Sequence, residues 1–522
     1  MTLAVVAAYL LVVLGIGLAS HRLGRATGED FFLAGRGMGS FVLLATLFGT
    51  HMTAFSILGA SGEAYHRGIG VFALMASSSA LVVPAVFFFV GTRLWALGKR
   101  HGYLTQVEYF RDRWGSETVA LTLFVVLVGL LLPYLLIGVK GAGLTLAELT
   151  GGAVPAWAGS LGLCLVVLTY VSYGGMRGTA WVNTFQTVVF MTLGAVTMVV
   201  LLRRMGGLGE VMGQLAETEP ELLVREGRIR PLELLSYTLI PLSAGMFPHL
   251  FGHWLTARRA STFRLSIVGY PLCVAVVWLP SVLLGMAGRL TVPGLEGPAA
   301  NSVLVRMIEA GAPEVLAGLL GAGVFAAIMS SVDSQTLALS NLFTRDVAGR
   351  LGRGRFGGRS KEGRRPGETG LGETGLGESG LSEAAQVRAG RFFVAAVLAV
   401  TFLLSIVIDR SIFRLGVWSF TGFAALFPLV IAALYWRRST RQGALASVLT
   451  AAAAWIYFLA RAWSEPGYTV GGTGLMPVVV ITAAAAFALV AVSLLTPAPE
   501  PERLARFFGS APSPSNDEKI EQ

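Results

Sequence analysis

Long apolar runs separated by short polar segments dominate this chain of 522 residues. The hydrocarbon core of a bilayer is about 30 Å thick, so a helix needs about 20 apolar residues to cross it. A window of that length finds thirteen candidate spans, at residues 2–20, 38–63, 71–96, 118–148, 155–173, 180–202, 234–255, 265–288, 315–344, 392–408, 412–436, 443–463 and 475–495. The pattern predicts an all-α integral membrane protein with about 13 transmembrane helices.

The composition supports a membrane protein. Hydrophobic residues make up 54% of the chain and charged residues only 13%, which is unlike a soluble domain. The first twenty residues lack a basic stretch before their apolar run, so we expect a retained helix rather than a cleaved signal peptide. Cys164 and Cys273 lie in separate apolar segments without metal-ligand spacing, and we expect both to be core residues.

The basic residues predict the orientation of the chain. Lys and Arg resist translocation in short loops, so loops rich in them stay in the cytoplasm. Most of these residues fall in the alternate connections that would be cytoplasmic if the N-terminus lies outside and the C-terminus inside. We therefore expect a multi-pass protein of the cell inner (plasma) membrane. The sequence has no basic patch interleaved with aromatic residues that would favour nucleic acid.

One connection differs from the others. Residues 345–391 are rich in Gly, Arg and Glu and contain the repeats GETGL, GETGL and GESGL at 367–381. A segment of this composition buries too little apolar surface to fold, so we expect a disordered cytoplasmic loop. Residues 496–522 are expected to form a cytoplasmic tail.

Two spans contain breaks at corresponding positions. Gly49 and Thr50 interrupt the apolar run 38–63, and Gly245 and Pro248 interrupt 234–255. Transporters are often built from inverted repeats whose first helices are broken near the bilayer midplane. The two spans lie five apart and therefore run in opposite directions. Chance remains an alternative, because Gly and Pro are common in membrane helices.

An inverted repeat divides the chain as follows. The first repeat would cover residues 38–202 (spans 2–6), and the second would cover 234–436 (spans 7–11) around the loop 345–391. The helix at 1–20 and the two helices within 443–495 would be peripheral. The prediction is thus a core of five plus five helices.

The sequence IMSSVDSQ at 328–335 places hydroxyls and a carboxylate within an apolar span. Ser330 and Ser331 lie about 100° apart on a helix, and the Ala327 carbonyl is one turn before them. A dehydrated Na⁺ needs about five or six oxygen ligands, and the broken span could add the carbonyls of Gly49 and Met52. The alternative is that these serines bond only to their own helix.

Four motifs, in the correct order, resemble the sodium/solute symporter family. They are EDFFLAGRGMG at 29–39, YVSYGGMRGTAWVNTFQ at 170–186, FPHLFGHW at 247–254 and AAIMSSVDSQTLALSNLFTRD at 326–346. The resemblance extends along nearly the whole chain. It implies the five-plus-five inverted-repeat (LeuT-like) fold, an outward N-terminus, and secondary active transport driven by sodium as the coupling ion.

The resemblance also implies positions for the sodium site. The family's shared site falls on the carbonyls of Gly49, Met52 and Ala327 and on the hydroxyls of Ser330 and Ser331. These are the groups that the helix geometry brings together. No other cofactor and no metal besides sodium is expected.

Two further polar residues are candidates for the path by which the ion leaves. Asp333 follows the serine pair, and it either attracts the departing ion or caps a polar cluster. Many family members carry an aspartate where this chain has Asn183, in the element Trp181-Val-Asn183-Thr-Phe-Gln186. The missing charge puts a second sodium site in doubt, so we expect one sodium per transport cycle.

The residues within the spans give limited information about the solute. Basic groups outnumber acidic ones there, with His51, Lys140, His249 and His253 against Asp333. This balance suits a small anion such as a monocarboxylate, which a half-helix N-terminus would also attract. The candidate substrate contacts are Thr53, Ser56, Phe247 and His249. Trp418 and Phe420 are equally consistent with a cavity wall and with packing.

Other function classes fit the sequence less well. An enzyme would need a nucleophile with its base or a metal cluster, and the sequence contains neither HExxH nor GxSxG. A sensor would need a signalling domain, and the predicted tail is too short to form one. A proton-coupled symporter on the same fold remains a rival, as does a sodium symporter of a neutral sugar or amino acid. No obligatory protein partner is evident.

Overall fold

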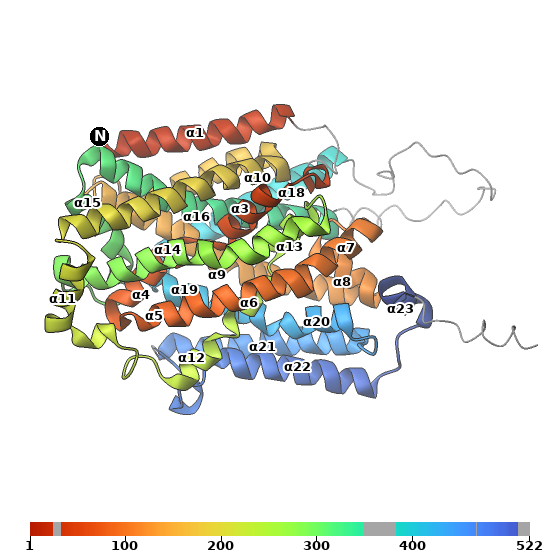
Figure 1. The fold of residues 1–522 in the computed structure, drawn as a ribbon. Helices are drawn as coiled ribbons and strands as arrows, with labels where there is room; N and C mark the ends of the chain where they lie inside the picture. Colours follow the sequence, from red (N-terminus) through yellow and green to blue (C-terminus); the bar gives the residue numbers. More distant parts are fainter. Residues whose placement is uncertain (24–32, 349–382, 466, 510–522) are drawn as a thin grey trace, which may run out of the picture.

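The computed structural model describes residues 1–23, 33–348, 383–465 and 467–509. These residues form a bundle of helices that run mostly along one common direction (Figure 1). Ten helical stretches are long and apolar enough to cross a membrane: Thr2–Ala19, Gly70–His101, Glu117–Leu149, Gly175–Arg204, Ala260–Thr291, Glu314–Ala348, Arg388–Val407, Ile412–Tyr435, Arg441–Ser464 and Pro477–Leu495. Two bent helix pairs raise that number to twelve if each pair is one span. A total of thirteen spans stays a prediction.

The helices have the following bounds. The first half of the chain contains α1 (Thr2–Leu23), α3 (Ser40–His51), α4 (Ala60–Arg67), α5 (Gly70–Phe72), α6 (Ser78–Val86), α7 (Thr92–His101), α8 (Gln106–Trp114), α9 (Glu117–Leu149) and α10 (Ala156–Arg204). The middle contains α11 (Leu208–Thr218), α12 (Pro231–Tyr237), α13 (Pro248–Leu255), α14 (Phe263–Thr291), α15 (Val303–Gly311) and α16 (Glu314–Leu342). The last part contains α18 (Glu383–Val407), α19 (Ile412–Ala425), α20 (Phe427–Tyr435), α21 (Arg441–Ser464), α22 (Pro477–Leu495) and α23 (Pro501–Phe508).

Both predicted breaks are present. Helix α3 ends at His51, Met52 is extended, and the next helical turn starts at Phe55, with a bend of 61° between the two parts. The second broken pair is bent by 51°, and its second part, α13, starts at Pro248 after the extended residue Phe247. Proline suits the first position of a helix because the amide it lacks would have no helical partner.

Helix α10 contains two spans that the sequence predicts separately, at 155–173 and 180–202. The chain breaks at Gly175, whose φ is 55°, a conformation that glycine adopts at little cost. The break separates the apolar segments Ala156–Ser172 and Gly175–Arg204. The connection between the two spans is therefore shorter than the predicted polar linker.

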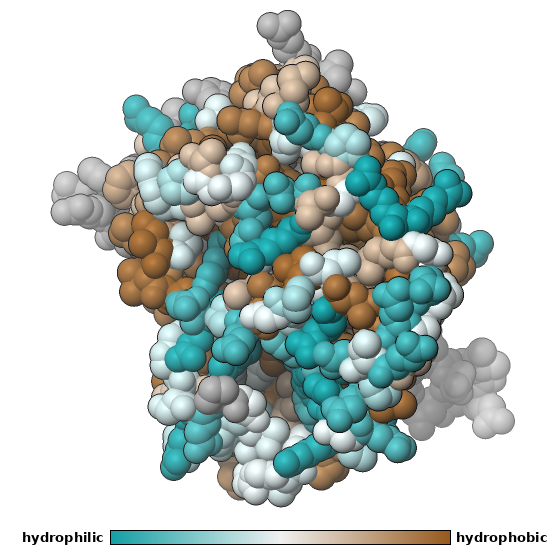
Figure 2. All heavy atoms as spheres, turned by 90° about the vertical axis from the view of Figure 1, so that its left-hand side faces the viewer, coloured by the Kyte–Doolittle hydropathy of each residue, from teal (hydrophilic) through white to brown (hydrophobic). Residues whose placement is uncertain are grey.

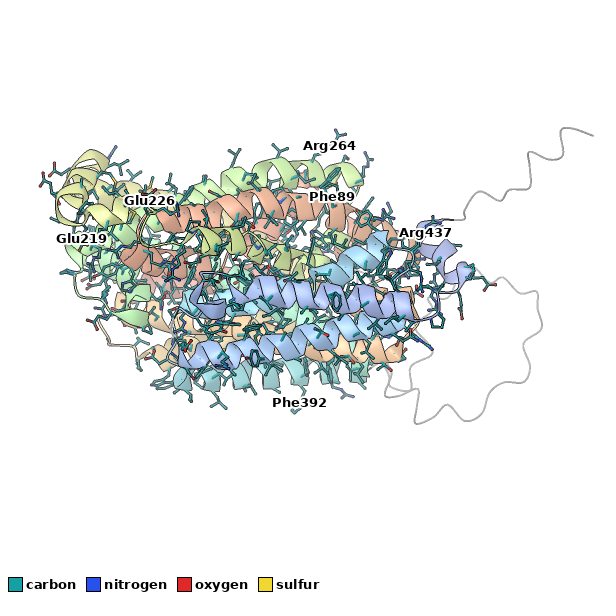
Figure 3. All side chains as sticks on the ribbon, turned by 90° about the horizontal axis from the view of Figure 1, so that it is seen from below. Phe89, Glu219, Glu226, Arg264, Phe392 and Arg437 are labelled. Carbon is teal, nitrogen blue, oxygen red and sulfur yellow. The ribbon has the colours of Figure 1, made fainter. Side chains whose placement is uncertain are left out.

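The side of the bundle is apolar and its ends are charged. Phe89 and Phe392 are 56% and 78% exposed, and Phe392 lies at the outer edge of the bundle in Figure 3. Glu219 and Glu226 lie at one end, which we call the α11 end, and Arg437 lies at the other, the α8 end (Figure 3). Figure 2 shows the α11 end with hydrophilic residues spread over much of its face. An exposed apolar belt between two polar ends is typical of a protein that spans a bilayer.

The predicted disordered loop 345–391 is helical at both of its ends. A π-helical turn, Phe343–Ala348, continues α16, and α18 begins at Glu383, so the predicted loop boundaries were wrong at both ends. Arg345 and Asp346 are held there by ion pairs with Glu108 and Arg111 of α8. Residues 349–382, including the repeats at 367–381, lie outside the described residues, as do residues 510–522.

The predicted tail 496–522 contains the short helix α23. Phe507 of α23 is only 5% exposed, and its ring contacts the rings of Tyr109 and His101. The Arg506 guanidinium lies 3.0 Å from the Asp112 carboxylate of α8. An aromatic anchor and an ion pair therefore hold this segment against the α8 end of the bundle.

Candidate functional site

Helix α16 carries the candidate sodium residues through the centre of the bundle. Its most apolar stretch is 83% buried, the largest share among the ten candidate spans of the described chain. Ser330 and Ser331 are both almost fully buried. They face a region where α3, α9, α10 and α13 converge on α16 (Figure 1). A hydroxyl at this depth must find its hydrogen-bond partners within the protein or in a ligand.

Ser330 joins α16 to the break in α3. Its hydroxyl donates to the Gly49 carbonyl at 2.8 Å and to the Ala327 carbonyl at 3.0 Å. The Gly49 carbonyl is available because α3 ends two residues later, which removes its helical amide partner. The structure thus brings together three of the five predicted sodium-site residues: Gly49, Ala327 and Ser330.

The other two predicted residues, Ser331 and Met52, do not contact this group in the same way. The Ser331 hydroxyl donates to the Ile328 carbonyl at 3.0 Å, so it bonds within its own helix. Met52 is buried within the break of α3, and its amide still donates to Phe48 at 2.9 Å. For the Ser331 hydroxyl oxygen to face an ion, its side chain would have to change rotamer.

Gly49 also permits the close approach of α3 to α10. A Cβ at this position would lie 2.1 Å from Thr187 Oγ1 and 3.5 Å from the Asn183 carbonyl. Only a residue without a side chain fits there. At the break, the carbonyls of Gly49 and Ala327 and the hydroxyl of Ser330 form a set of neutral oxygens. Oxygens of this kind bind hard cations.

A buried polar cluster continues from this point along α16. Asp333 is completely buried and accepts from the Tyr170 hydroxyl at 2.8 Å and from the Ser334 hydroxyl at 3.2 Å. With its amide nitrogen turned towards Asp333, Asn183 donates to each carboxylate oxygen at 3.0 Å and accepts from Ser334 at 2.7 Å. His253 Nε2 lies 3.2 Å from Ser334 Oγ.

This cluster changes how Asn183 is interpreted. The sequence indicates a lost negative charge at position 183, whereas the structure places the Asp333 carboxylate directly beside that asparagine. The carboxylate beside Asn183 is thus supplied by the facing helix. Since three neutral donors already surround the carboxylate, its contacts match those of a residue that organises a polar cluster.

Aromatic rings form a second group beside the serine pair, which we call the aromatic centre. Its members are Phe247, His249, Tyr134 and Phe420. The ring centroid of Tyr134 lies 5.2 Å from that of Phe247, 5.5 Å from that of His249 and 4.9 Å from that of Phe420. All four rings are buried, and they come from α9, α13 and its preceding residue, and α19. Such a group can enclose a small organic molecule.

The predicted substrate contacts divide between this centre and its surroundings. Phe247 and His249 are in the aromatic centre, and the two ring nitrogens of His249 have no hydrogen-bond partner among the described residues. Thr53 accepts from the Phe55 amide at 2.9 Å and so caps the helical turn after the break. Ser56 is buried in that same turn.

Several other basic and aromatic candidates have structural roles. The Lys140 ammonium donates to the carbonyls of Ile408 and Arg410 at 2.7 and 3.0 Å, and so holds the carboxyl end of α18. His51 hydrogen-bonds to the Tyr270 hydroxyl. Trp418 is partly exposed, and its carbonyl accepts from Trp455 at 2.8 Å.

Sequence reasoning missed four residues of this region: Tyr134, Tyr170, Ser334 and Gln335. Tyr134 lies in an apolar run without a distinguishing pattern, so the sequence offers no signal for it, whereas Tyr170 is the first residue of the motif at 170–186. Ser334 and Gln335 belong to IMSSVDSQ, and Gln335 is four residues after Ser331, on the same side of the helix. That spacing could have identified Gln335.

Comparison with known proteins decides the family. The model of the sodium:solute symporter family matches residues 31–355, more than half of the chain. The chain belongs to the sodium:solute symporter family. The protein is therefore a membrane transporter rather than an enzyme, and its family implies sodium coupling.

Two curated relatives in this family are similar over most of the chain. A sodium/pantothenate symporter of Escherichia coli (strain K12) is 26% identical over 463 residues, which cover 85% of this chain and 87% of the relative. An uncharacterized symporter of Bacillus subtilis (strain 168) is 25% identical over 350 residues, which cover 65% of this chain and 71% of the relative.

Two solved structures have the same fold as this chain. The substrate-bound, outward-open state of a Na⁺-coupled sialic acid symporter matches with a TM-score of 0.74 and 16% identity, over 96% of this chain and 98% of that one. Mhp1, a nucleobase-cation-symport-1 family transporter, matches with a TM-score of 0.58 and 13% identity, over 91% and 97%. The predicted fold class, an all-α membrane protein with a LeuT-like inverted-repeat core, is confirmed. The boundaries of the two repeats stay predictions.

Proposed function

We propose that this symporter carries a small monocarboxylate-type organic anion into the cell together with Na⁺, by alternating access. The observation that carries this proposal is His249, a fully buried side chain with both ring nitrogens unpartnered among the described residues. Buried polar groups normally have partners, so an unpartnered one beside a cluster of rings is a candidate ligand contact.

The position of His249 supports an anionic ligand. It is the second residue of α13, and the first amides of a helix have no helical partner and carry partial positive charge. No side chain caps this helix start. A carboxylate could therefore accept from the backbone of α13 and from the His249 ring at the same time.

A curated relative supports the same substrate class. The relative from Escherichia coli is named a sodium/pantothenate symporter, and pantothenate is a monocarboxylate. Phe247, Phe420 and Tyr134 would contact the apolar part of the solute, with Thr53 and Ser56 at the edge of the site.

For sodium, we propose the ligands that the sequence predicts: the carbonyls of Gly49, Met52 and Ala327 and the hydroxyls of Ser330 and Ser331. The contacts of Ser330 support this site, since the carbonyl oxygens of Gly49 and Ala327 lie 2.8 and 3.0 Å from its hydroxyl oxygen. Met52 and Ser331 would complete the shell after local rearrangement. The five ligands together match the oxygen coordination that sodium needs.

The proposed exit path for sodium follows the polar cluster. Asp333 and Asn183 lie just beyond the serines, and next to them a cavity runs towards the α8 end, lined by His253, Ser334 and Asn341 among others. We propose that the α8 end faces the cytoplasm and that the N-terminus lies outside. The arginines at the α8 end, including Arg111, Arg113, Arg437, Arg438, Arg503 and Arg506, support this orientation.

Replacing His249 with Gln tests the substrate class. Glutamine keeps a donor of similar reach but cannot become cationic, so we expect the apparent KM for a small carboxylate to rise several-fold while sodium activation changes little. Uptake of radiolabelled carboxylates into proteoliposomes measures both quantities. His101→Gln, at the α8 end of the bundle, is the matched control.

Two outcomes would contradict this proposal. One is a strong preference of the wild type for a neutral sugar or a zwitterionic amino acid. The other is unchanged uptake by the His249→Gln variant for every solute tested. Either result would leave His249 as a structural residue of α13.

A further inference from the structure

We propose that Gln335 and Tyr134 form a second polar subsite that recognises an amide or hydroxyl group on the transported solute. The inference rests on the proposed function, because it extends the same binding site. It narrows the substrate class to short carboxylic acids that carry a second hydrogen-bonding group.

The first observation is an unpartnered amide. Gln335 is 1% exposed, and neither its amide nitrogen nor its amide oxygen has a hydrogen-bond partner within the described part of the chain. A glutamine side chain offers two N–H donors and one acceptor oxygen. Leaving all of them unused in a protein interior is unfavourable, so a ligand or ordered water is expected there.

The second observation is a neighbouring phenol. The Tyr134 hydroxyl is also buried and has no partner among the described residues, although Gln335 of the adjacent helix α16 lies beside it. A single hydrogen bond between the two would still leave part of the amide unused. Together they present donors and acceptors from α9 and α16 at one place.

The placement of Tyr134 connects this pair to the proposed carboxylate site. Its ring lies 5.5 Å from the His249 ring and 4.9 Å from the Phe420 ring, measured between centroids. The ring of Tyr134 is therefore packed within the aromatic centre, while its hydroxyl is next to Gln335. A solute held by its carboxylate at α13 would reach this pair with its other end.

The chemistry of the pair defines the group it recognises. An amide side chain is complementary to a group that both donates and accepts, such as a secondary amide or a hydroxyl. A site built to hydrogen-bond such a group discriminates strongly against an analogue that lacks it, because its own polar atoms then stay unpaired. An unsubstituted fatty acid should therefore bind poorly.

The same residue links the solute to the proposed sodium site. Gln335 lies four residues after Ser331 on α16, so the two side chains project from one side of the helix, one turn apart. A solute bound to Gln335 and an ion bound near Ser330 would both restrain α16. Binding of one should then favour binding of the other.

Two matched probes test the subsite: N-acetyl-β-alanine, which has a carboxylate and an amide, and hexanoate, which has the same chain length without the amide. Thermal stabilisation of the full-length protein in detergent with sodium measures their binding. We expect the half-saturating concentration of N-acetyl-β-alanine to be at least tenfold lower than that of hexanoate. Gln335→Met and Tyr134→Phe should bring this ratio close to one by weakening only the amide probe.

The control is Tyr109→Phe, which removes another buried hydroxyl that has no partner among the described residues, at the α8 end and away from the aromatic centre. It should leave the ratio unchanged. Equal binding of the two probes to the wild type, no stabilisation by either probe, or an unchanged ratio in Gln335→Met would overturn the subsite. The last result would mean that the pair binds only water.

A third probe separates this inference from the proposed function. N-acetyl-β-alaninamide keeps the acyl amide and lacks the carboxylate. If it binds as well as the acid and Gln335→Met weakens it, the subsite stands and the carboxylate assignment fails. The opposite result is that only N-acetyl-β-alanine binds and that Gln335→Met leaves its preference over hexanoate unchanged. In that case the carboxylate assignment stands and the subsite fails.

Discussion

Sodium-driven uptake is expected to collapse in the double variant Ser330→Ala, Ser331→Ala, while the protein still folds. The change removes both hydroxyls proposed to bind sodium but keeps a helix-forming segment in the buried part of α16. A hydrogen bond or contact with a charged partner contributes about 1.5–3 kcal/mol, so each lost hydroxyl should weaken sodium activation about tenfold or more. Uptake at a fixed solute concentration, measured over a range of sodium concentrations, checks this.

The single variants and a control sharpen this result. Ser330→Ala should have the larger effect, because its hydroxyl reaches the Gly49 carbonyl of the broken helix, whereas that of Ser331 bonds within α16. Ser281→Ala is the control, since this buried hydroxyl bonds only the Val277 carbonyl of its own helix at 2.9 Å. A double variant that retained wild-type sodium dependence would refute the assignment of these serines.

Replacing Asp333 with Ala is expected to destabilise the protein strongly. The Tyr170 hydroxyl would lose its acceptor inside the bundle, and the Ser334 hydroxyl and the Asn183 amide would each lose one of their partners. A buried polar group left without a partner costs about 1–3 kcal/mol, so a loss of at least that size in the free energy of unfolding is expected. Thermal unfolding of the purified protein in detergent gives the measurement.

This variant also distinguishes the two roles considered for Asp333. Asp409→Ala serves as the control, because Asp409 pairs with Lys140 at 3.6 Å through a side chain that is 89% exposed. A structural role predicts a large drop in unfolding temperature for Asp333→Ala and almost none for the control. A stable Asp333→Ala protein with slow sodium release would instead assign the carboxylate to the exit path alone.

The features that follow from local sequence were predicted well. Apolar run length located the spans, and Gly and Pro located both broken helices, because these properties depend on neighbours along the chain. The serine pair on α16 and the Gly49 carbonyl were predicted to meet, and Ser330 joins them. Helical periodicity was sufficient to select the serine pair, and the position of the break was sufficient to select the Gly49 carbonyl.

Contacts between distant helices could not be predicted in the same way. Lys140 was counted among the basic groups that suit an anionic solute, yet its ammonium holds the end of α18 through two carbonyls. The carboxylate that faces Asn183 is that of Asp333, 150 residues later by sequence number. Both cases depend on which helices pack together, and no local pattern contains that information.

The most direct test of the account uses purified protein in proteoliposomes, with sodium and pH gradients imposed separately. We predict that radiolabelled N-acetyl-β-alanine accumulates only when sodium is higher outside the vesicles, with a Hill coefficient near 1 for sodium and no accumulation from a pH gradient alone. Accumulation driven by a pH gradient in the absence of sodium would contradict sodium coupling and assign the protein to proton-coupled transport instead.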